Sequence, residues 1–213
     1  MTTSFVISLV LLLGLIIWLV ASWKINRVDS PRYMVTARKK DYEIRTYEPY
    51  IVAETIVEGS RRTALNAGFR ILAKYIFGDN SAKKSLAMTA PVGERSSSDS
   101  RTIAMNAPVI TRDNSNSSHV ISFVMPRTET MTTLPQPLDS RIVLNTIPSQ
   151  TVAVMKFSWY ATESRIQAKK DALKSALIRD GVIMQGSISY AGYTAPFTIP
   201  FLEKHEVMVV IQG

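Results

Sequence analysis

Two stretches of this chain show the same order of predicted elements, two strands followed by a helix, and this repetition limits the folds that the chain can form. In the first stretch, residues 42–47 and 50–57 are rich in β-branched and aromatic residues, as strands are, and Pro49 separates them. In the second stretch the same features fall at residues 141–147 and 151–157. The repetition predicts an α+β domain of two pseudo-symmetric ββα halves, with both helices packed on an antiparallel sheet.

Each predicted helix has suitable residues at its two ends. Ser60 and Thr162 are of the types that cap helix N-termini, and Gly78 and Gly181 lie where a left-handed C-terminal residue is wanted. Apolar residues recur at helical spacing on one face of each helix, namely Leu65, Phe69, Leu72 and Ile76 in the first and Ile166, Leu173 and Leu177 in the second. We expect these faces to pack on the sheet.

Each helix is followed by further strand-like segments, at residues 102–110 and 119–125 in the first half and at residues 187–193 and 207–211 in the second. Two polar stretches, residues 93–101 and 112–118, are rich in Ser, Asn and Asp, which compete for backbone hydrogen bonds. We expect both stretches to be exposed loops. A groove between the two halves is a natural place for a ligand.

Residues 5–23, which precede these elements, contain no charged residue. At about 1.5 Å per residue, a helix of this stretch is about 28 Å long, close to the roughly 30 Å hydrocarbon core of a bilayer. Trp18 and Trp23 lie toward its C-terminal end, where indoles favour the membrane interface. A cleaved signal peptide is the alternative, but its apolar region is usually about 7–15 residues long and follows basic residues. We expect residues 1–23 to form one transmembrane helix.

Residues 24–40 hold most of the net charge of the chain. Six basic residues and one acid in this segment supply +5 of the formal net charge of +8, so residues 41–213 carry only +3. This distribution is typical of a basic juxtamembrane linker that contacts anionic lipid headgroups, and it differs from a nucleic-acid-binding face. By the positive-inside rule, we expect a single-pass membrane protein whose domain, residues 41–213, is cytoplasmic.

Composition and motifs exclude several kinds of chemistry. The chain has no cysteine, which rules out structural disulfides, thiolate nucleophiles and Cys-ligated zinc. The sequence also lacks the P-loop, the Gly-x-Gly-x-x-Gly loop, the His-Glu-x-x-His helix and the Gly-x-Ser-x-Gly elbow. We therefore expect a binding protein rather than an enzyme.

A short motif occurs twice in the first half of the chain. Residues 87–92 read Ala-Met-Thr-Ala-Pro-Val, and residues 104–109 read Ala-Met-Asn-Ala-Pro-Val. Proline restricts the residue before it to extended backbone, and the small residues permit close backbone approach. The simplest interpretation of the motif is two strand edges with a structural role.

The doubled motif and several other stretches resemble the SOUL haem-binding family over residues 41–210. The other matching stretches are residues 42–45 with Tyr47, 67–69, 75–78, 123–126, 134–137, 152–154, 157–158 and 201–208. The resemblance implies a distorted antiparallel β-barrel of two pseudo-symmetric halves with two long helices, similar to bacterial effector-binding domains. It also implies reversible binding of haem or another porphyrin. One departure is the Glu-Lys-His-Glu run at residues 203–206, where the family has an Arg-Arg-Asn-Glu-like run.

Haem carries propionates, which favour Arg or Lys, on a flat ring. Arg61, Arg62 and Arg70 lie on or beside the first predicted helix, next to its apolar face, and are candidates for the propionates. The candidates for contact with the ring are Leu65 and Phe69 on that helix and Met88 and Met105 in the doubled motif. The alternatives are that the cations are solvated on the helix surface and that the methionines fill the core.

His119 and His205 are the two histidines of the chain and the candidate ligands of the haem iron. Glu206 follows His205 and could fix its tautomer. Each histidine has a simpler alternative role, an exposed loop position for His119 and a hydrogen-bonded surface position for His205. Because the chain has no Cys-x-x-Cys-His motif, haem would be bound non-covalently.

From the resemblance and the apolar N-terminal stretch, we expect a membrane-tethered domain that binds haem or a related tetrapyrrole for buffering, delivery or sensing. One alternative is an enzyme that processes tetrapyrroles, with Glu206 as proton carrier. Another is a membrane-tethered sensor of a different hydrophobic ligand or of a protein partner, again with Glu206 at its centre. The expected partners are the tetrapyrrole and the lipid bilayer, without nucleic acid.

Overall fold

The computed structural model describes residues 7, 30–96, 118–193 and 200–212 of the 213-residue chain. Within this part, the strands are β1 (Tyr33–Arg38), β2 (Glu43–Tyr47), β3 (Tyr50–Glu58), β4 (Val92–Ser96), β5 (Ser118–Val124), β6 (Val143–Ile147), β7 (Gln150–Phe157), β8 (Met184–Gly192) and β9 (His205–Ile211). The α-helices are α2 (Arg61–Ile76) and α3 (Glu163–Arg179), and Pro200–Leu202 form the short 3-10 helix η2. The predicted α+β class is confirmed.

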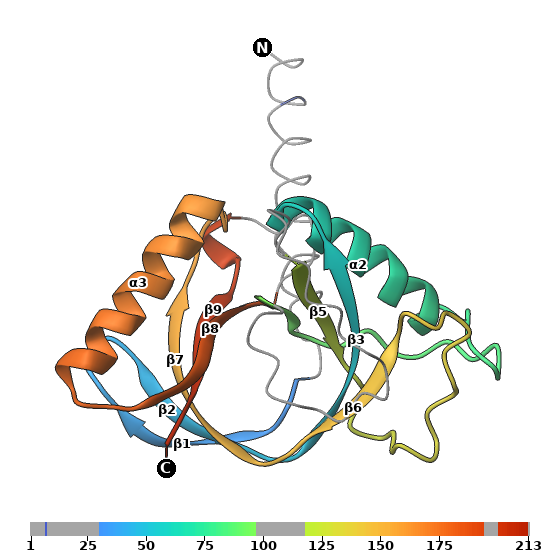
Figure 1. Ribbon diagram of the computed structural model, residues 1–213, viewed down its shortest axis with the longest axis horizontal. Coiled ribbons are helices and arrows are strands. Elements are labelled where there is room, and N and C mark those ends of the chain that lie inside the picture. The colour runs from blue at the N-terminus through green and yellow to red at the C-terminus, as the bar shows by residue number, and fades with distance from the viewer. Residues whose placement is uncertain (1–6, 8–29, 97–117, 194–199, 213) are drawn as a thin grey trace.

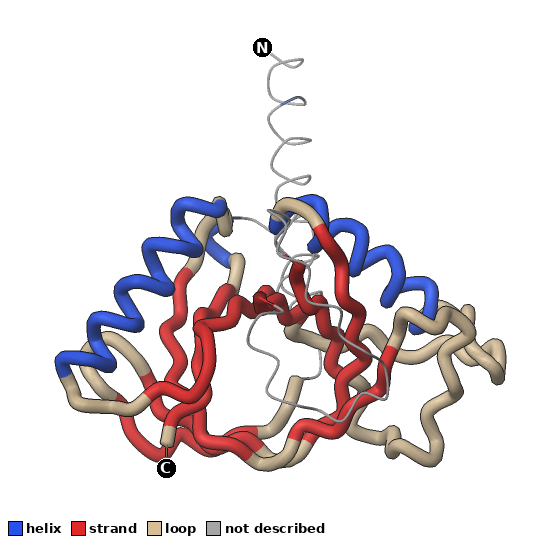
Figure 2. The backbone as a smooth tube through the Cα atoms, in the orientation of Figure 1, coloured by secondary structure: helices blue, strands red, loops and turns tan. Residues whose placement is uncertain are grey.

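The strands form one antiparallel sheet in the order β1-β2-β7-β9-β8-β4-β5-β3-β6. The two ββα halves exchange their first strands, since β2 pairs with β7 of the second half and β6 pairs with β3 of the first. The halves also meet at the centre, where β4 pairs with β8 from Val92↔Gly192 to Glu94↔Tyr190. The sheet curls, and the two helices lie on its opposite flanks (Figures 1 and 2). Neither half therefore has a complete sheet of its own.

The two helices begin and end where the sequence predicts. The Ser60 hydroxyl accepts a hydrogen bond from the Thr63 amide at the start of α2, and Thr162 caps α3 in the same way. Gly78 and Gly181 follow the last helical turns with φ of +113° and +69°, a conformation that favours glycine. These four residues fix the length of both helices.

Each helix buries its apolar face against its own half of the sheet. Leu72, Tyr75 and Ile76 of α2 pack on a cluster that includes Ala53, Ile121 and Phe123, and Ile166, Leu173 and Leu177 of α3 pack on one that includes Ala153, Val207 and Val209. On the other face of the sheet, Tyr47, Val152 and Val154 form a smaller buried cluster. The curled sheet is thus covered by helices on one face and lined by side chains on the other.

Two strands lie in segments that the sequence predicts to be a loop and a linker. Residues 93–101 are predicted to be a loop, but Val92–Ser96 form β4, which pairs with both β5 and β8, so that part of the loop prediction is wrong. Residues 24–40 are predicted to be a linker, but Tyr33–Arg38 form β1 on the edge of the sheet. The folded part therefore begins before Asp41. Smaller differences are that β8 and β9 begin three and two residues earlier than predicted.

Several predicted features lie outside the described residues. They are the apolar stretch at residues 5–23 apart from Ile7, the predicted strand at residues 102–110, the second copy of the motif at residues 104–109 and most of the loop at residues 112–118. In the part of the chain that the structure describes, no helix is long and apolar enough to cross a membrane.

Gly68 sets the distance between α2 and the sheet. A Cβ atom at Gly68 would lie 2.6 Å from Cγ1 and 2.7 Å from Cβ of Ile121, which is fully buried in β5. Although Gly→Ala usually stabilises a helix, we expect Gly68→Ala to destabilise the fold by about 1–3 kcal/mol, because the core must shift to admit the methyl group. Chemical unfolding followed by circular dichroism measures the change. Asn66→Ala, on the exposed face of α2, is the control, and equal stability of the two variants would contradict close packing at Gly68.

Candidate functional site

A cluster of polar side chains lies on the helix-facing side of the sheet, where the two halves meet. Glu94 of β4 accepts a hydrogen bond from Nε of Arg61, at the start of α2, at 2.8 Å, and its other oxygen lies 3.0 Å from Nδ1 of His119. Glu94 is only 3% exposed, so both partners are needed to offset the burial of its charge. Arg61, Glu94 and His119 form the first-half side of this seam cluster.

The second-half side of the seam cluster consists of Tyr190, His205 and Glu203. The Tyr190 hydroxyl lies 2.9 Å from Nδ1 of His205, and Nε2 of His205 lies 2.9 Å from Glu203. Burial raises the pKa of Tyr190 to about 12, so its hydroxyl remains protonated at neutral pH. The guanidinium of Arg61 lies 5.0 Å from the centre of the Tyr190 ring and joins the two sides.

The contacts of the two histidines within the seam cluster limit their ability to ligate iron. Both ring nitrogens of His205 have protein partners, so neither is free to ligate iron. His119 is also buried, contrary to the alternative of an exposed loop position, and its Nε2 has neither solvent exposure nor a hydrogen-bond partner. In this structure both histidines are parts of the seam cluster.

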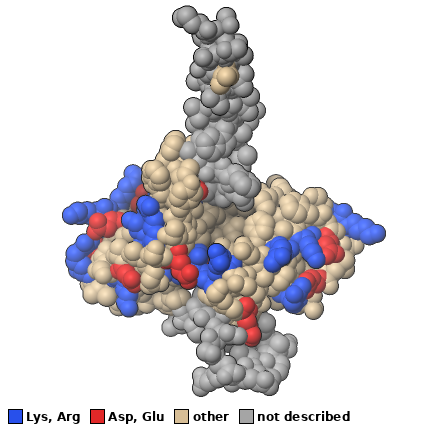
Figure 3. All heavy atoms as spheres, turned by 90° about the horizontal axis from the view of Figure 1, so that it is seen from above, with Lys and Arg blue, Asp and Glu red and all other residues tan. Residues whose placement is uncertain are grey.

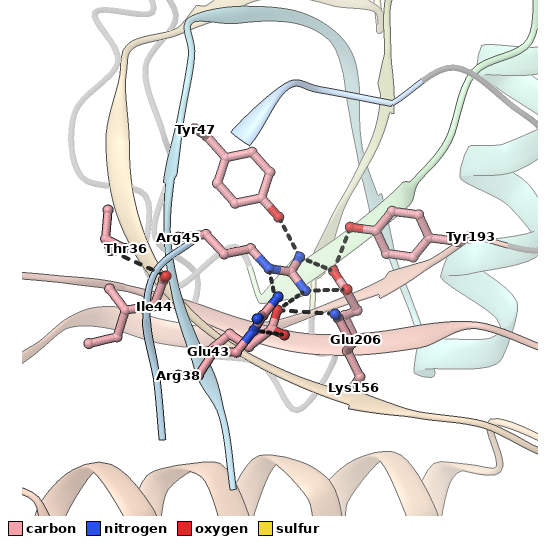
Figure 4. A network of polar contacts seen from close by, with 9 residues as sticks. All are labelled: Thr36, Arg38, Glu43, Ile44, Arg45, Tyr47, Lys156, Tyr193 and Glu206. Carbon is pink, nitrogen blue, oxygen red and sulfur yellow. Dashed lines mark hydrogen bonds and ion pairs between the residues drawn. The ribbon is translucent and has the colours of Figure 1, made fainter. Parts of the chain in front are cut away.

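The opposite face of the sheet holds a network around Arg45 that joins β2 to β9 (Figure 4). The fully buried Arg45 donates to both oxygens of Glu206, at 3.1 and 2.9 Å, and also to Glu43 and to the hydroxyl of Tyr47. Tyr193 donates to Glu206 at 2.6 Å. The guanidinium thus makes a two-pronged contact with a carboxylate that comes from the other half of the chain.

The charged groups in this network stabilise one another. Burial alone would lower the pKa of Arg45, but the hydrogen bonds and charge of Glu206 outweigh burial and raise that pKa above its ordinary value. Burial and the nearby charge of Glu206 raise the pKa of Tyr193 well above its ordinary value. The ring of Tyr33 from β1 lies 4.3 Å from the Arg45 guanidinium and covers it. Arg45 and Glu206 form a fixed ion pair between neutral tyrosines.

The same face encloses a small cavity. Its volume is about 270 Å³, and its apolar lining includes Tyr50, Val52, Val124, Val152 and Met208. Pockets that enclose drug-sized ligands usually measure about 300–1,000 Å³. The cavity is therefore too small to enclose a tetrapyrrole.

The residues predicted to contact haem are separated by the structure into two groups. Leu65 and Phe69 lie side by side on α2, half-buried, and Phe69 packs edge-on against Phe123 at 5.2 Å. Arg62 and Arg70 lie on the exposed side of this pair, and neither forms an ion pair within the described residues. This set of four, the α2 face, presents an apolar strip beside two cations.

The other predicted contact residues do not join the α2 face. Arg61 is committed to Glu94 and is only 15% exposed at its side chain. Met88 is 43% exposed and precedes β4, next to Thr89, whose hydroxyl donates to the carbonyl of Val124. Met105 lies outside the described residues.

The two halves of the fold differ at the α2 face. The N-caps Ser60 and Thr162 align the two helices, and in this alignment Gln167 and Asp171 of α3 take the places of Leu65 and Phe69. Gln167 donates to Asp171 at 3.0 Å on a solvated helix surface. Leu65 and Phe69 also pack against the core under α2, so the difference concerns the half of each side chain that stays exposed.

Charges on the surface are mixed. Seen from above, Lys and Arg side chains lie among Asp and Glu and do not form one continuous basic patch on this face (Figure 3). A basic patch or stripe is the electrostatic footprint of a nucleic-acid-binding protein. This face does not have that footprint.

Comparisons with known proteins agree with the resemblance seen in the sequence. A family model described as "SOUL heme-binding protein" matches residues 28–210. Heme-binding protein 2 of Homo sapiens is 30% identical over 173 residues, which cover 80% of this chain and 78% of that protein. Heme-binding protein 2 of Mus musculus is 28% identical over 193 residues, covering 90% and 84%.

Two solved structures share the fold at low sequence identity. The C-terminal domain of EcmrR superposes with a TM-score of 0.55 at 9% identity and covers 84% of this chain and 98% of that domain. A hydrolase from Listeria innocua gives a TM-score of 0.52 at 10% identity, covering 83% and 94%. At such identities the likeness concerns the fold alone.

The Arg45–Glu206 pair should behave as one unit. We expect Arg45→Met to cost about 3–5 kcal/mol of stability, because it leaves the Glu206 charge buried without its partner, and the double variant with Glu206→Met to cost less than the sum of the single changes. Chemical unfolding of the four proteins measures the coupling. Arg179→Met, which breaks exposed ion pairs with Asp41 and Asp180, is the control and should have little effect. Additive costs for Arg45 and Glu206 would contradict a coupled pair.

Proposed function

Because this chain belongs to the SOUL heme-binding protein family, we propose that it binds haem or a closely related tetrapyrrole, non-covalently, on the α2 face. The observation that carries the choice of site is the half-buried pair Leu65 and Phe69 beside Arg62 and Arg70, which form no ion pair within the described residues. At the two positions of α3 that correspond to Leu65 and Phe69 when counted from the N-caps, the residues are Gln167 and Asp171. Haem combines an apolar ring with carboxylates, and the α2 face offers a surface for each.

The geometry of the α2 face suits a flat amphiphilic ligand. Leu65 and Phe69 are one helical turn apart and form a continuous apolar strip, against which a ring can lie. Arg62 and Arg70 are about 12 Å apart along the helix axis, and their long side chains can converge on the carboxylates at the edge of the ring. Arginine binds a carboxylate through two parallel hydrogen bonds, which orients the ligand as well as holding it.

Affinity at this face would come from apolar contact and charge and not from a histidine bond to iron. His119 and His205 are both held in the seam cluster. Within α2, the single residue of a type that ligates haem iron is Tyr75, and its side chain is fully buried and donates to the carbonyl of Pro135. The proposal therefore differs from the sequence-based expectation of a histidine ligand.

A membrane tether is part of the proposal. The support for it is the uncharged stretch at residues 5–23 and the six cations that follow within residues 24–40. With the positive-inside rule, the tetrapyrrole-binding domain would lie on the cytoplasmic side and act in buffering, delivery or sensing of tetrapyrroles at the membrane surface.

The hydrogen bonds of Glu206 disfavour the two alternative functions that would use this carboxylate. These are an enzyme that processes tetrapyrroles and a membrane-tethered sensor of a different ligand. Both oxygens of Glu206 accept hydrogen bonds from Arg45, and one accepts a further bond from Tyr193. A proton carrier needs contact with its substrate, and a site for a cationic ligand needs an unpaired negative charge. Glu206 offers neither, so binding of a tetrapyrrole remains the function that the site supports best.

The two cations of the α2 face provide a direct test. We expect the double change Arg62→Glu and Arg70→Glu to weaken haem binding by at least about tenfold, since each charge-assisted contact contributes about 1 kcal/mol or more. Titration of the protein with haem, followed by absorbance in the Soret region, measures the affinity. The matched control is Arg165→Glu with Lys174→Glu, which makes the same charge change on the exposed surface of α3. Equal losses in both double variants would contradict a specific site on α2.

The histidines provide a second test. We expect His119→Ala and His205→Ala to keep haem affinity within about twofold of the unaltered protein, because neither ring reaches the α2 face, and to lower stability, because each leaves a buried partner unsatisfied. Haem titration and chemical unfolding of the same samples separate the two effects. A shift of the Soret band in one variant, at unchanged stability, would show that this histidine ligates iron.

A further inference from the structure

Three large aromatic side chains project from one end of the second half. Trp159 is 52% exposed, Tyr160 is 61% exposed and Phe201 is 55% exposed. The amide of Trp159 donates to the carbonyl of Pro200 at 2.9 Å, so the loop after β7 and η2 lie against each other. We call Trp159, Tyr160 and Phe201 the aromatic tip.

The backbone holds Trp159 outward at a cost. Its φ is +73°, in the left-handed region, which is rare for a bulky residue. Burial of a tryptophan side chain is favourable, yet here the strained backbone leaves about half of the residue exposed. Backbone strain of this kind clusters at functional sites, which makes Trp159 a candidate for a functional contact.

The equivalent loop in the first half lacks this tip. Between β3 and α2 the chain turns in two residues, Gly59 and Ser60, whereas between β7 and α3 it takes residues 158–162. Both turns end in the same kind of N-cap. The longer turn is therefore not needed to connect a strand to a helix in this fold, and its extra residues include Trp159 and Tyr160.

The aromatic tip lies close to the place where the described domain begins. Ser30 lines the same surface pocket as Ser158 and Lys204, which flank the tip in sequence. The apolar stretch ends at Trp23, seven residues before Ser30, and an extended chain covers at most about 3.6 Å per residue. The start of the domain is thus within about 25 Å of the C-terminal end of the apolar stretch.

We propose that the aromatic tip lies in the headgroup region of the bilayer to which residues 5–23 tether the chain, and so holds the domain in one orientation on the membrane. The inference rests on the proposed tether. Trp and Tyr are the residues that favour the membrane interface, and the exposed Lys204 beside the tip suits anionic headgroups. Both helices begin at this end of the molecule, so the docked domain would present Arg62 and the start of the α2 face toward the membrane (Figure 1).

The experiment uses the full chain reconstituted in vesicles of phosphatidylcholine and phosphatidylserine. The chain has three tryptophans, so Trp18→Phe with Trp23→Phe leaves Trp159 as the single indole. We expect brominated phosphatidylcholine to quench Trp159 fluorescence by at least half, because bromine quenches on contact. The matched control also carries Trp159→Phe and Ile178→Trp, which moves the indole to an exposed site at the other end of α3, where quenching should be small.

A second probe is independent of the tryptophan background. The chain has no cysteine, so Ser158→Cys and Ser175→Cys each provide one site for an environment-sensitive dye. We expect a blue shift of dye emission on vesicles at position 158 and none at position 175. Equal quenching at Trp159 and at the Ile178→Trp site, or equal dye shifts, in chains that float with the vesicles would overturn the aromatic-tip proposal and leave the tether intact. Failure of the chain to float with vesicles would overturn both.

Discussion

The exchange of strands between the two halves is the constraint on which the rest of the structure depends. Because β2 pairs with β7, and β6 with β3, neither half can complete its sheet without the other. The exchange brings Arg45 of the first half to Glu206 of the second across 161 residues of sequence. The pairing of β4 with β8 then sets Glu94 beside Tyr190 and creates the seam cluster. Both polar networks are thus consequences of the topology, and they bind the halves together.

Within a repeated architecture, function is most easily recognised where the repeats differ. The helices have equivalent N-caps, yet counted from these caps Leu65 and Phe69 on α2 correspond to Gln167 and Asp171 on α3. The strand-to-helix turns differ as well, since only the second carries exposed aromatic residues. Folding explains the shared features, because each helix must cover its half of the sheet. The differences are the places to which we assign the proposed tetrapyrrole face and the proposed membrane contact.

Prediction of structure from the sequence succeeded where the signal is local. Caps, glycine stops and helical spacing predicted α2 and α3 nearly to the residue, because these signals act within one turn. It failed for β4, where polar residues suggested a loop, since Glu94 is satisfied by partners that are distant in sequence. The strand β1 was missed as well, because the basic residues around it suggested a linker. The Arg45–Glu206 pair and the burial of both histidines depend on strand order, which no local pattern reveals. The candidate residues on α2 could be named from the sequence. The ion pair between Arg61 and Glu94, which holds Arg61 in the seam cluster, could not be predicted.

The central claim is that the tetrapyrrole binds on α2 and not inside the curled sheet. Ferric haem is paramagnetic and broadens the amide signals of nearby residues in an NMR spectrum, so its position can be mapped along the chain. The account predicts that the strongest broadening on addition of haem falls on residues 62–70 of α2, with the equivalent residues of α3 unaffected. Strongest broadening on strands that line the small inner cavity, such as β7 and β9, would contradict it.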